Sequence, residues 1–178
     1  MKNLTLPFYN DVAHRFVVEF TTMKYIPARV STITAPITLM SETISMYIDF
    51  TIPFIYLPNS ICSKFESEFG LQWDVDYEIY TVNGTQHTAL QNMNPNITLT
   101  IANTAGQNLD IILSYATFDL TATFPVLSNP SNITVSIFYF PLKRADNDTQ
   151  YTLGRVFLQD ISLHNSIIFP PLTRVSAT

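Results

Sequence analysis

Short runs of β-branched and aromatic residues dominate the hydrophobic pattern of this chain. The runs are separated by Asn, Gly, Pro and Asp, a pattern typical of a β-domain. Asn83-Gly84 stands between two such runs, and because both residues accept a positive φ it predicts a type I′ hairpin turn. The predicted strands are Arg15–Ile26, Arg29–Thr34, Ile44–Leu57, Tyr77–Val82, Thr85–Leu90, Ile97–Ala102, Leu109–Ser114, Leu120–Phe124 and Ile133–Phe140.

Two segments have helical spacing instead. Pro58–Gly70 places apolar residues four apart, with Asn59 or Ser60 as the N-cap and Gly70 as the stop. Arg155–Asp160 follows directly on a Leu-Gly step. No repeat or linker divides the chain, so we expect one all-β domain over residues 1–178, with two short helices.

The composition excludes several classes of partner. The 178 residues are 47% hydrophobic and only 13% charged, which is too apolar for a disordered chain. The formal net charge is -5 and no basic run occurs, so nucleic acid and anionic membrane surfaces would be repelled. No apolar stretch reaches the roughly 18 residues of a membrane span. We therefore expect no nucleic acid or membrane partner.

Neither the histidines nor the clustered acids have the spacing of a metal site. Asp74, Asp76 and Glu78 alternate with apolar residues, which predicts a solvated extended edge rather than a calcium site. The histidines are widely separated and are interpreted as solvated strand or loop side chains. They are His14, His87 and His164. We predict no metal and no other cofactor.

Glycosylation-type sequons suggest a secreted ancestry. They occur at Asn3, Asn83, Asn96, Asn132 and Asn147. The first residues lack the apolar core of a signal peptide, and one explanation is that the chain starts in the middle of a longer protein. Cys62 has no partner within the sequence, so we expect a small buried hydrophobe and no disulfide.

Asp49 is the most informative candidate for chemistry. It lies in an apolar run from Met46 to Pro58, where the neighbouring residues predict a buried strand. Desolvation disfavours an ionised carboxylate, so a buried one needs a hydrogen-bonding partner or a chemical role. The alternative is an aspartate at a strand end that faces solvent or caps a turn.

Several stretches together resemble the C-terminal lobe of pepsin-like aspartic peptidases, particularly the fungal members. The resemblance runs from about residue 44 to residue 160, and residues 161–178 form a divergent tail. Of these stretches, the one around Leu153-Gly154-Arg155 is the most specific. The stretches are Tyr47–Pro58, Phe69–Leu71, Leu113–Leu120, Phe140–Ala145 and Gln150–Gln159.

The resemblance implies a shared active site with an absent N-terminal lobe. In that family each lobe supplies one aspartate, and the two carboxylates share a proton around a single water. Asp49 matches the aspartate of the second lobe, and Leu153-Gly154 matches a step where the missing Cβ lets the catalytic loop cross a strand closely. The substrate would be an extended polypeptide, and the location would be extracellular.

Three departures weaken the expectation of catalysis. Phe50 and Thr51 stand where the family has Thr or Ser and then Gly. No second Asp-Thr-Gly or Asp-Ser-Gly occurs, and the tail differs, which suggests a truncated, spliced or misread frame. Two hypotheses remain: an aspartic endopeptidase lobe that is inactive alone, or a peptidase-like module that binds without cleaving. A homodimer pairing two copies of Asp49 is a variant that the Phe50 and Thr51 changes oppose.

Overall fold

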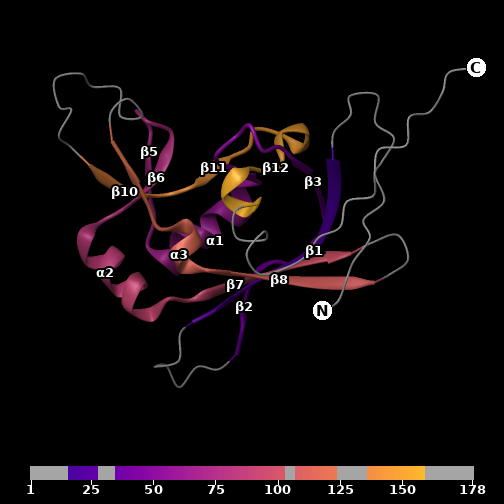
Figure 1. The fold of residues 1–178 in the computed structure, drawn as a ribbon, viewed down its shortest axis with the longest axis horizontal. Helices are drawn as coiled ribbons and strands as arrows, with labels where there is room; N and C mark the ends of the chain where they lie inside the picture. The colour runs from indigo at the N-terminus through magenta and orange to yellow at the C-terminus, as the bar shows by residue number, and fades with distance from the viewer. Residues whose placement is uncertain (1–15, 28–34, 103–106, 124–135, 159–178) are drawn as a thin grey trace, which may run out of the picture.

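The computed structural model describes residues 16–27, 35–102, 107–123 and 136–158. Within these residues the strands form one sheet of eight strands and one of four, with short helices around them (Figure 1). The predicted all-β class is confirmed. No helix in the described ranges has the length and apolar character needed to cross a bilayer.

The large sheet has the order β11-β4-β12-β3-β1-β7-β8, and β2 pairs with β1 beside this path. Its strands β1, β3, β7 and β8 pair antiparallel, whereas β12 is parallel to β3 and β11 is parallel to β4. The strands are β1 Phe16–Ile26, β2 Ile37–Met40, β3 Ile44–Ile48, β4 Ile55–Leu57, β7 Asn96–Ala102, β8 Asn108–Ser114, β11 Leu142–Arg144 and β12 Thr152–Leu153.

The small sheet is antiparallel, and the helices lie between strands of both sheets along the chain. Its order is β5 Gln72–Asp74, β6 Ile79–Val82, β10 Ile137–Phe140 and β9 Leu120–Ala122. The helical elements are α1 Asn59–Phe69, α2 Gly84–Met93, α3 Tyr115–Phe118 and the 3-10 turn η2 Asp148–Gln150, and residues 155–158 are also helical.

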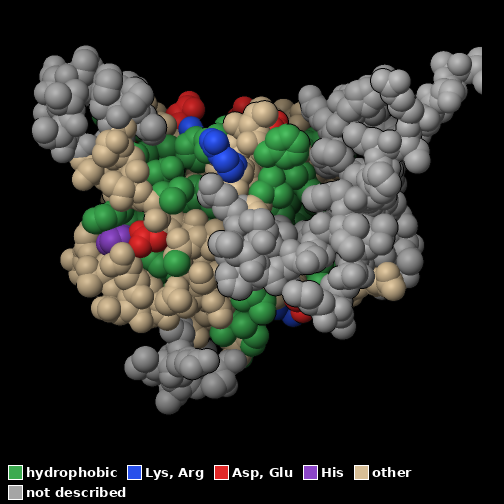
Figure 2. Space-filling model, viewed as in Figure 1, with side chains coloured by type: hydrophobic (Ala, Val, Ile, Leu, Met, Phe, Trp, Pro, Cys, Tyr) green, Lys and Arg blue, Asp and Glu red, His purple; other side chains and the backbone are tan. Residues whose placement is uncertain are grey.

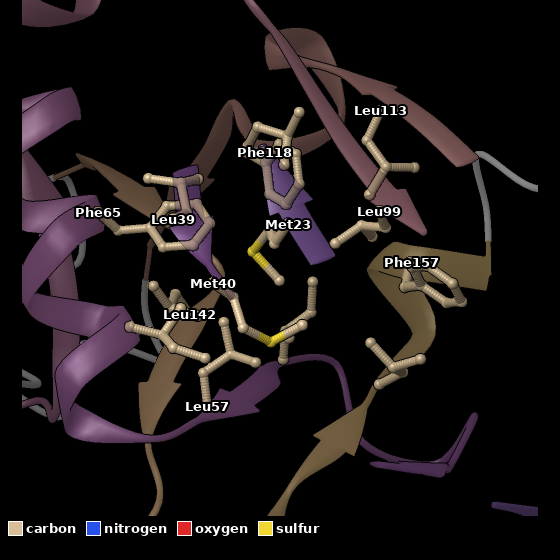
Figure 3. Packing of buried hydrophobic residues seen from close by; sticks show 14 of the residues in the cluster. Met23, Leu39, Met40, Leu57, Phe65, Leu99, Leu113, Phe118, Leu142 and Phe157 are labelled. Carbon is tan, nitrogen blue, oxygen red and sulfur yellow. The ribbon is translucent and has the colours of Figure 1, made fainter. Parts of the chain in front are cut away.

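One hydrophobic core joins α1 to the large sheet. Strands β7 and β8 alternate buried and more exposed residues, so that Leu99 and Leu113 face the same interior (Figure 3). From α1, the ring of Phe65 stacks on Phe69 at 5.4 Å between centroids, and Phe69 contacts Phe140 at 5.5 Å. Complete burial of each such side chain contributes roughly 1.5–3 kcal/mol, so this cluster holds α1 against the sheet.

Helix α1 ends as its sequence predicts but starts one or two residues earlier. Gly70 has φ +64° and takes the left-handed conformation that a side chain would disfavour. The N-cap is Pro58, whose side chain makes no capping hydrogen bond, so the predicted cap at Asn59 or Ser60 is wrong.

The predicted hairpin at Asn83-Gly84 and the predicted strand Thr85–Leu90 are wrong. Asn83 is the N-cap of α2, and its Oδ1 accepts a hydrogen bond of 2.9 Å from the backbone N–H of Gln86. An Asn side chain suits an N-cap as well as a turn, and only His87 and Leu90 of α2 are buried, three residues apart. Tertiary packing therefore decided the conformation.

The predicted continuous strand Ile44–Leu57 is two strands. The chain leaves the sheet after Ile48 and re-enters it at Ile55, because β12 occupies the position between β3 and β4. Pro53 lies in the intervening segment, where it does not have to donate to a ladder. This turn away from the sheet places Asp49 at a loop.

The acidic segment after β5 is a tight turn rather than an extended edge. Asp74 Oδ1 accepts hydrogen bonds from the backbone N–H groups of Asp76 and Tyr77, at 3.0 and 3.1 Å. Glu78 then adopts φ +50°, so β6 begins only at Ile79. The predicted extended alternation of the acids is wrong because side-chain-to-backbone bonds close the turn locally.

Several elements escaped prediction. The strands β2, β5, β11 and β12 are short, and α2 and α3 add to the two predicted helices. Conversely, β10 begins at Ile137, four residues after the predicted start, and β9 ends at Ala122. The predicted strand Arg29–Thr34 lies outside the described residues.

Candidate functional site

Asp49 lies directly after β3, where the chain leaves the large sheet. Its backbone N–H donates a 3.0 Å hydrogen bond to the carbonyl oxygen of Leu153, which extends the parallel pairing of β3 with β12 by one residue. The side chain is half-buried. Asp49 is thus anchored by its backbone to the strand that carries the Leu-Gly step.

The Asp49 carboxylate is held by its own loop. Oδ1 accepts two hydrogen bonds from Thr51, one of 2.8 Å from the backbone N–H and one of 2.6 Å from the hydroxyl. Hydrogen bonds to a carboxylate are stronger than neutral ones, so this pair fixes the direction of the side chain. Thr51 is exposed, and Phe50 between the two residues is 61% exposed.

Gly154 permits the loop to pass closely over the chain. A Cβ built at this position would lie 2.2 Å from the carbonyl oxygen of Phe54 and 2.4 Å from that of Ile52. No side chain fits at such distances. The next residue reinforces the crossing, because the Arg155 N–H donates a 2.7 Å hydrogen bond to Ile52 O. The segment 52–54 therefore lies directly against Gly154.

Buried side chains support this crossing from beneath. Leu153 and Phe157 are 1% and 0% exposed, and the Phe157 ring meets Phe20 of β1 edge-to-face at 6.0 Å. The Phe157 N–H also donates a 3.1 Å bond to Gly154 O, which starts the helical turn at residues 155–158. The loop that carries Asp49 thus rests on the main core.

This arrangement presents one oriented carboxylate. A fixed carboxylate accepts a proton or orients a water, but proton sharing in an aspartate dyad needs a second acid facing it. Among the described residues there is no cluster of three or more His, Cys, Asp or Glu side chains with the geometry to hold a metal ion.

The predicted glycosylation residues lie on the surface where they are described. Asn83, Asn96 and Asn147 are exposed. Two of them have engaged side-chain oxygens: Asn83 caps α2, and Asn147 Oδ1 accepts bonds from the Thr149 N–H and hydroxyl. Asn3 and Asn132 lie outside the described residues.

Cys62 is a buried small hydrophobe, as predicted. Its side chain is in the core, and the thiol lies 3.5 Å from the carbonyl oxygen of Leu57. Desolvation by burial raises the pKa of Cys62 to about 12. The thiol therefore stays protonated at neutral pH and is a poor nucleophile.

His87 is not the solvated strand or loop residue that its sequence suggested. It is 8% exposed on α2, and its Nε2 lies 2.7 Å from Asp119 Oδ1, while Gln91 donates a 2.9 Å bond to Asp119 Oδ2. The imidazole stacks on Phe138 at 3.6 Å between centroids. Figure 2 shows purple histidine atoms next to red acidic atoms on the viewed face. His14 and His164 lie outside the described residues.

The local sequence does not reveal the pairing of His87 with Asp119, because the two residues are 32 positions apart. The pattern around His87 also predicts a strand, whereas the residue lies in helix α2. A second polar group also escaped prediction. Tyr80 and Arg144 both bond to Glu66 Oε1, at 2.6 and 3.0 Å, and so join α1 to β6 and β11.

Comparisons with known proteins show a likeness at the level of structure and none at the level of sequence families. No protein-family model matches the sequence, and no curated protein matches it. A crystal structure of aspartic proteinase from Irpex lacteus is similar, with 13% sequence identity and a TM-score of 0.45. The match covers 85% of this chain and 44% of that chain, so this chain spans less than half the length of that proteinase. At this level of similarity the comparison assigns no activity to the chain.

Proposed function

We propose that this chain is one lobe of a secreted aspartic endopeptidase, in which Asp49 is one carboxylate of a catalytic pair. The observation that carries the proposal is the geometry of Asp49. Its backbone is bonded to Leu153, its Oδ1 accepts two bonds from Thr51, and its loop crosses Gly154 where a Cβ has no room. A carboxylate fixed in this way can bind and polarise a water with little reorganisation.

Thr51 offsets one departure from the family pattern, the presence of Phe50 where the family has Thr or Ser. Phe50 offers no hydroxyl, but Thr51 brings both a hydroxyl and a backbone N–H to the Asp49 carboxylate. This is support for a functional carboxylate despite the altered residues. A second acid would come from another lobe, so the 178-residue chain alone should not hydrolyse peptides.

The test is a peptidase assay at acid pH on the full-length gene product, with an unfolded polypeptide as substrate. Asp49→Asn should abolish cleavage, because an amide cannot act as the base. Asp76→Asn is the matched control, since Asp76 is an exposed aspartate in the turn after β5. Cleavage that survives Asp49→Asn, or no cleavage by the wild type, would overturn the proposal.

A second function is favoured by Phe50, a large aromatic side chain that is 61% exposed next to Asp49. Exposed aromatic residues often anchor protein partners. In this alternative the chain binds extended peptides through the Asp49 loop and does not cleave them. Phe50→Ala would then weaken peptide binding, whereas Asp49→Asn would leave it unchanged.

A further inference from the structure

A polar pocket of about 510 Å³ lies beside β4 and β11, and Asp49 is not among its lining residues. Its wall combines residues of β4, α1, β5 and β11. The volume falls within the range of small-molecule sites, which is roughly 300–1,000 Å³. Lys143 and Arg144, which are consecutive in β11, both line it.

Among the described residues, the Lys143 ammonium group makes a long ion pair with Glu78 and lies 4.9 Å from the centre of the Phe54 ring. Its side chain is only 14% exposed, and desolvation lowers the pKa of its ammonium group. In the described part of the chain its acidic partner is Glu78, whose Oε2 lies 3.9 Å from Nζ, beyond hydrogen-bond distance. Glu78 is itself 74% exposed, so water screens much of this attraction. An ammonium group has three donors, and this contact satisfies none of them fully.

Arg144 supplies a second positive charge in a fixed position. Nε donates a 2.8 Å bond to the Tyr80 hydroxyl and an NH2 group donates a 3.0 Å bond to Glu66. The guanidinium also lies 4.7 Å above the centre of the Trp73 ring. These contacts engage two of the five N–H donors of Arg144 among the described residues, and its side chain is 38% exposed. The group is preorganised and still accessible.

The first turn of α1 adds positive potential to the same wall. Asn59 and Ser63 line the pocket, no side chain caps the helix, and its first turn has no acidic residue. The positive end of the helix dipole therefore lies beside the two cations. This contribution supports the charges of Lys143 and Arg144 and would not make a site without them.

Two acidic residues, Glu78 and Asp146, line the pocket together with the two cations, and Glu66 is ion-paired with Arg144 at 3.0 Å. Asp146 is exposed and its Oδ2 lies 3.4 Å from Gln150 Nε2, so it is engaged within its own turn. Glu78 is held by a backbone at φ +50°, a region that non-glycine residues seldom adopt. Because Glu78 is 74% exposed and lies 3.9 Å from Lys143 Nζ, it is the counter-ion that a bound anion would have to displace.

We propose that this pocket binds a small anion bearing a carboxylate or phosphate group, with its oxygens between Lys143 Nζ and the Arg144 guanidinium. The anion takes the place of Glu78 at Lys143 and sits beside the first turn of α1. The site is independent of Asp49 and of any peptidase activity.

The test uses Trp73, which lines the pocket and is the single tryptophan of the sequence. Its fluorescence in the full 178-residue chain is titrated with succinate, citrate and inorganic phosphate, against sodium chloride at equal ionic strength. At least one probe should give a saturable change with a dissociation constant on the order of millimolar. The probe that binds best separates a carboxylate site from a phosphate site.

Variants make the result specific. Lys143→Met should weaken binding by about tenfold or more, because it removes a charged donor. Lys24→Met, at an exposed lysine of β1, should leave binding unchanged. Glu78→Gln should strengthen binding several-fold, and since Glu78 is exposed this variant should fold normally. No saturable change with any probe, unchanged binding in Lys143→Met, or weaker binding in Glu78→Gln would overturn the proposal.

Discussion

Gly154 lies so close to Phe54 that a Cβ on the glycine would be 2.2 Å from the Phe54 carbonyl oxygen. The contact is with backbone, which cannot rotate away as a side chain can. It holds the loop after β3 against the start of the helical turn at residues 155–158, and the Arg155 N–H donates a hydrogen bond to the carbonyl oxygen of Ile52 in the same loop. The position of Asp49 depends on this crossing.

Gly154→Ala should lower the free energy of unfolding by about 3 kcal/mol, because the methyl group forces two backbone segments apart. The control is Gly84→Ala, where a Cβ would meet nothing within 4 Å at the start of α2. That change should be neutral or stabilise by about 0.5 kcal/mol. Urea denaturation of both variants measures the difference, and equal stabilities would contradict the close crossing.

The sequence predicted those elements whose burial alternates regularly. Strands β7 and β8 match the predicted ranges Ile97–Ala102 and Leu109–Ser114 to within one residue, because each buries every second side chain. Helix α1 was predicted because its buried residues recur every four positions and Gly70 ends it. In these elements local pattern and tertiary packing agree.

Other elements depended on partners that are distant in sequence. Asn83 is equally suited to a hairpin turn and to a helix N-cap. The helix forms because α2 packs against the rest of the chain, and the pairing of His87 with Asp119 is part of that packing. Strands β11 and β12 have too few residues to show a period, and they exist because β4 and β3 offer them edges. The apolar run around Asp49 marks this carboxylate as a candidate for chemistry. Its hydrogen bonds with Thr51 depend on the conformation of the loop after β3, which the sequence pattern does not predict.

The pairing of His87 with Asp119 should contribute to stability. Asp119 accepts bonds from two α2 side chains, His87 and Gln91, so Asp119→Ala leaves a buried imidazole nitrogen without its acceptor. We expect a loss of about 1–3 kcal/mol in the free energy of unfolding, measured by urea denaturation. Asp76→Ala, at an exposed aspartate, should change it by less than about 0.5 kcal/mol. Similar losses in both variants would show that the pairing is not stabilising.

Alkaline pH should destabilise the protein through Cys62. Burial raises the pKa of the thiol from 9.0 to about 12, so the folded state binds the proton more tightly than the unfolded state. The contribution to stability is fully present below pH about 9 and is lost as the pH rises toward 12. Burial also raises the pKa of Tyr80 and Tyr115, which adds to the same loss.

Cys62→Ala isolates the contribution of the thiol. In urea denaturation over this pH range, the decline of unfolding free energy with pH should be shallower in the variant, by up to about 1.4 kcal/mol per pH unit. The Tyr115 contribution remains in both proteins and cancels in the comparison, whereas the Tyr80 contribution decreases slightly in the variant because Cys62 is one of the groups that raise the pKa of Tyr80. Parallel declines would contradict a raised thiol pKa. As an independent check, a thiol-alkylating reagent at neutral pH should modify Cys62 only after unfolding.

The most direct measurement of the central claim is kcat/KM for cleavage of an unfolded polypeptide at acid pH by the full-length gene product, wild type against Asp49→Asn. If Asp49 is one carboxylate of a catalytic pair, the substitution should lower kcat/KM by at least about 10²–10⁴-fold while Asp76→Asn leaves it unchanged. A kcat/KM for Asp49→Asn equal to that of the wild type would contradict the account.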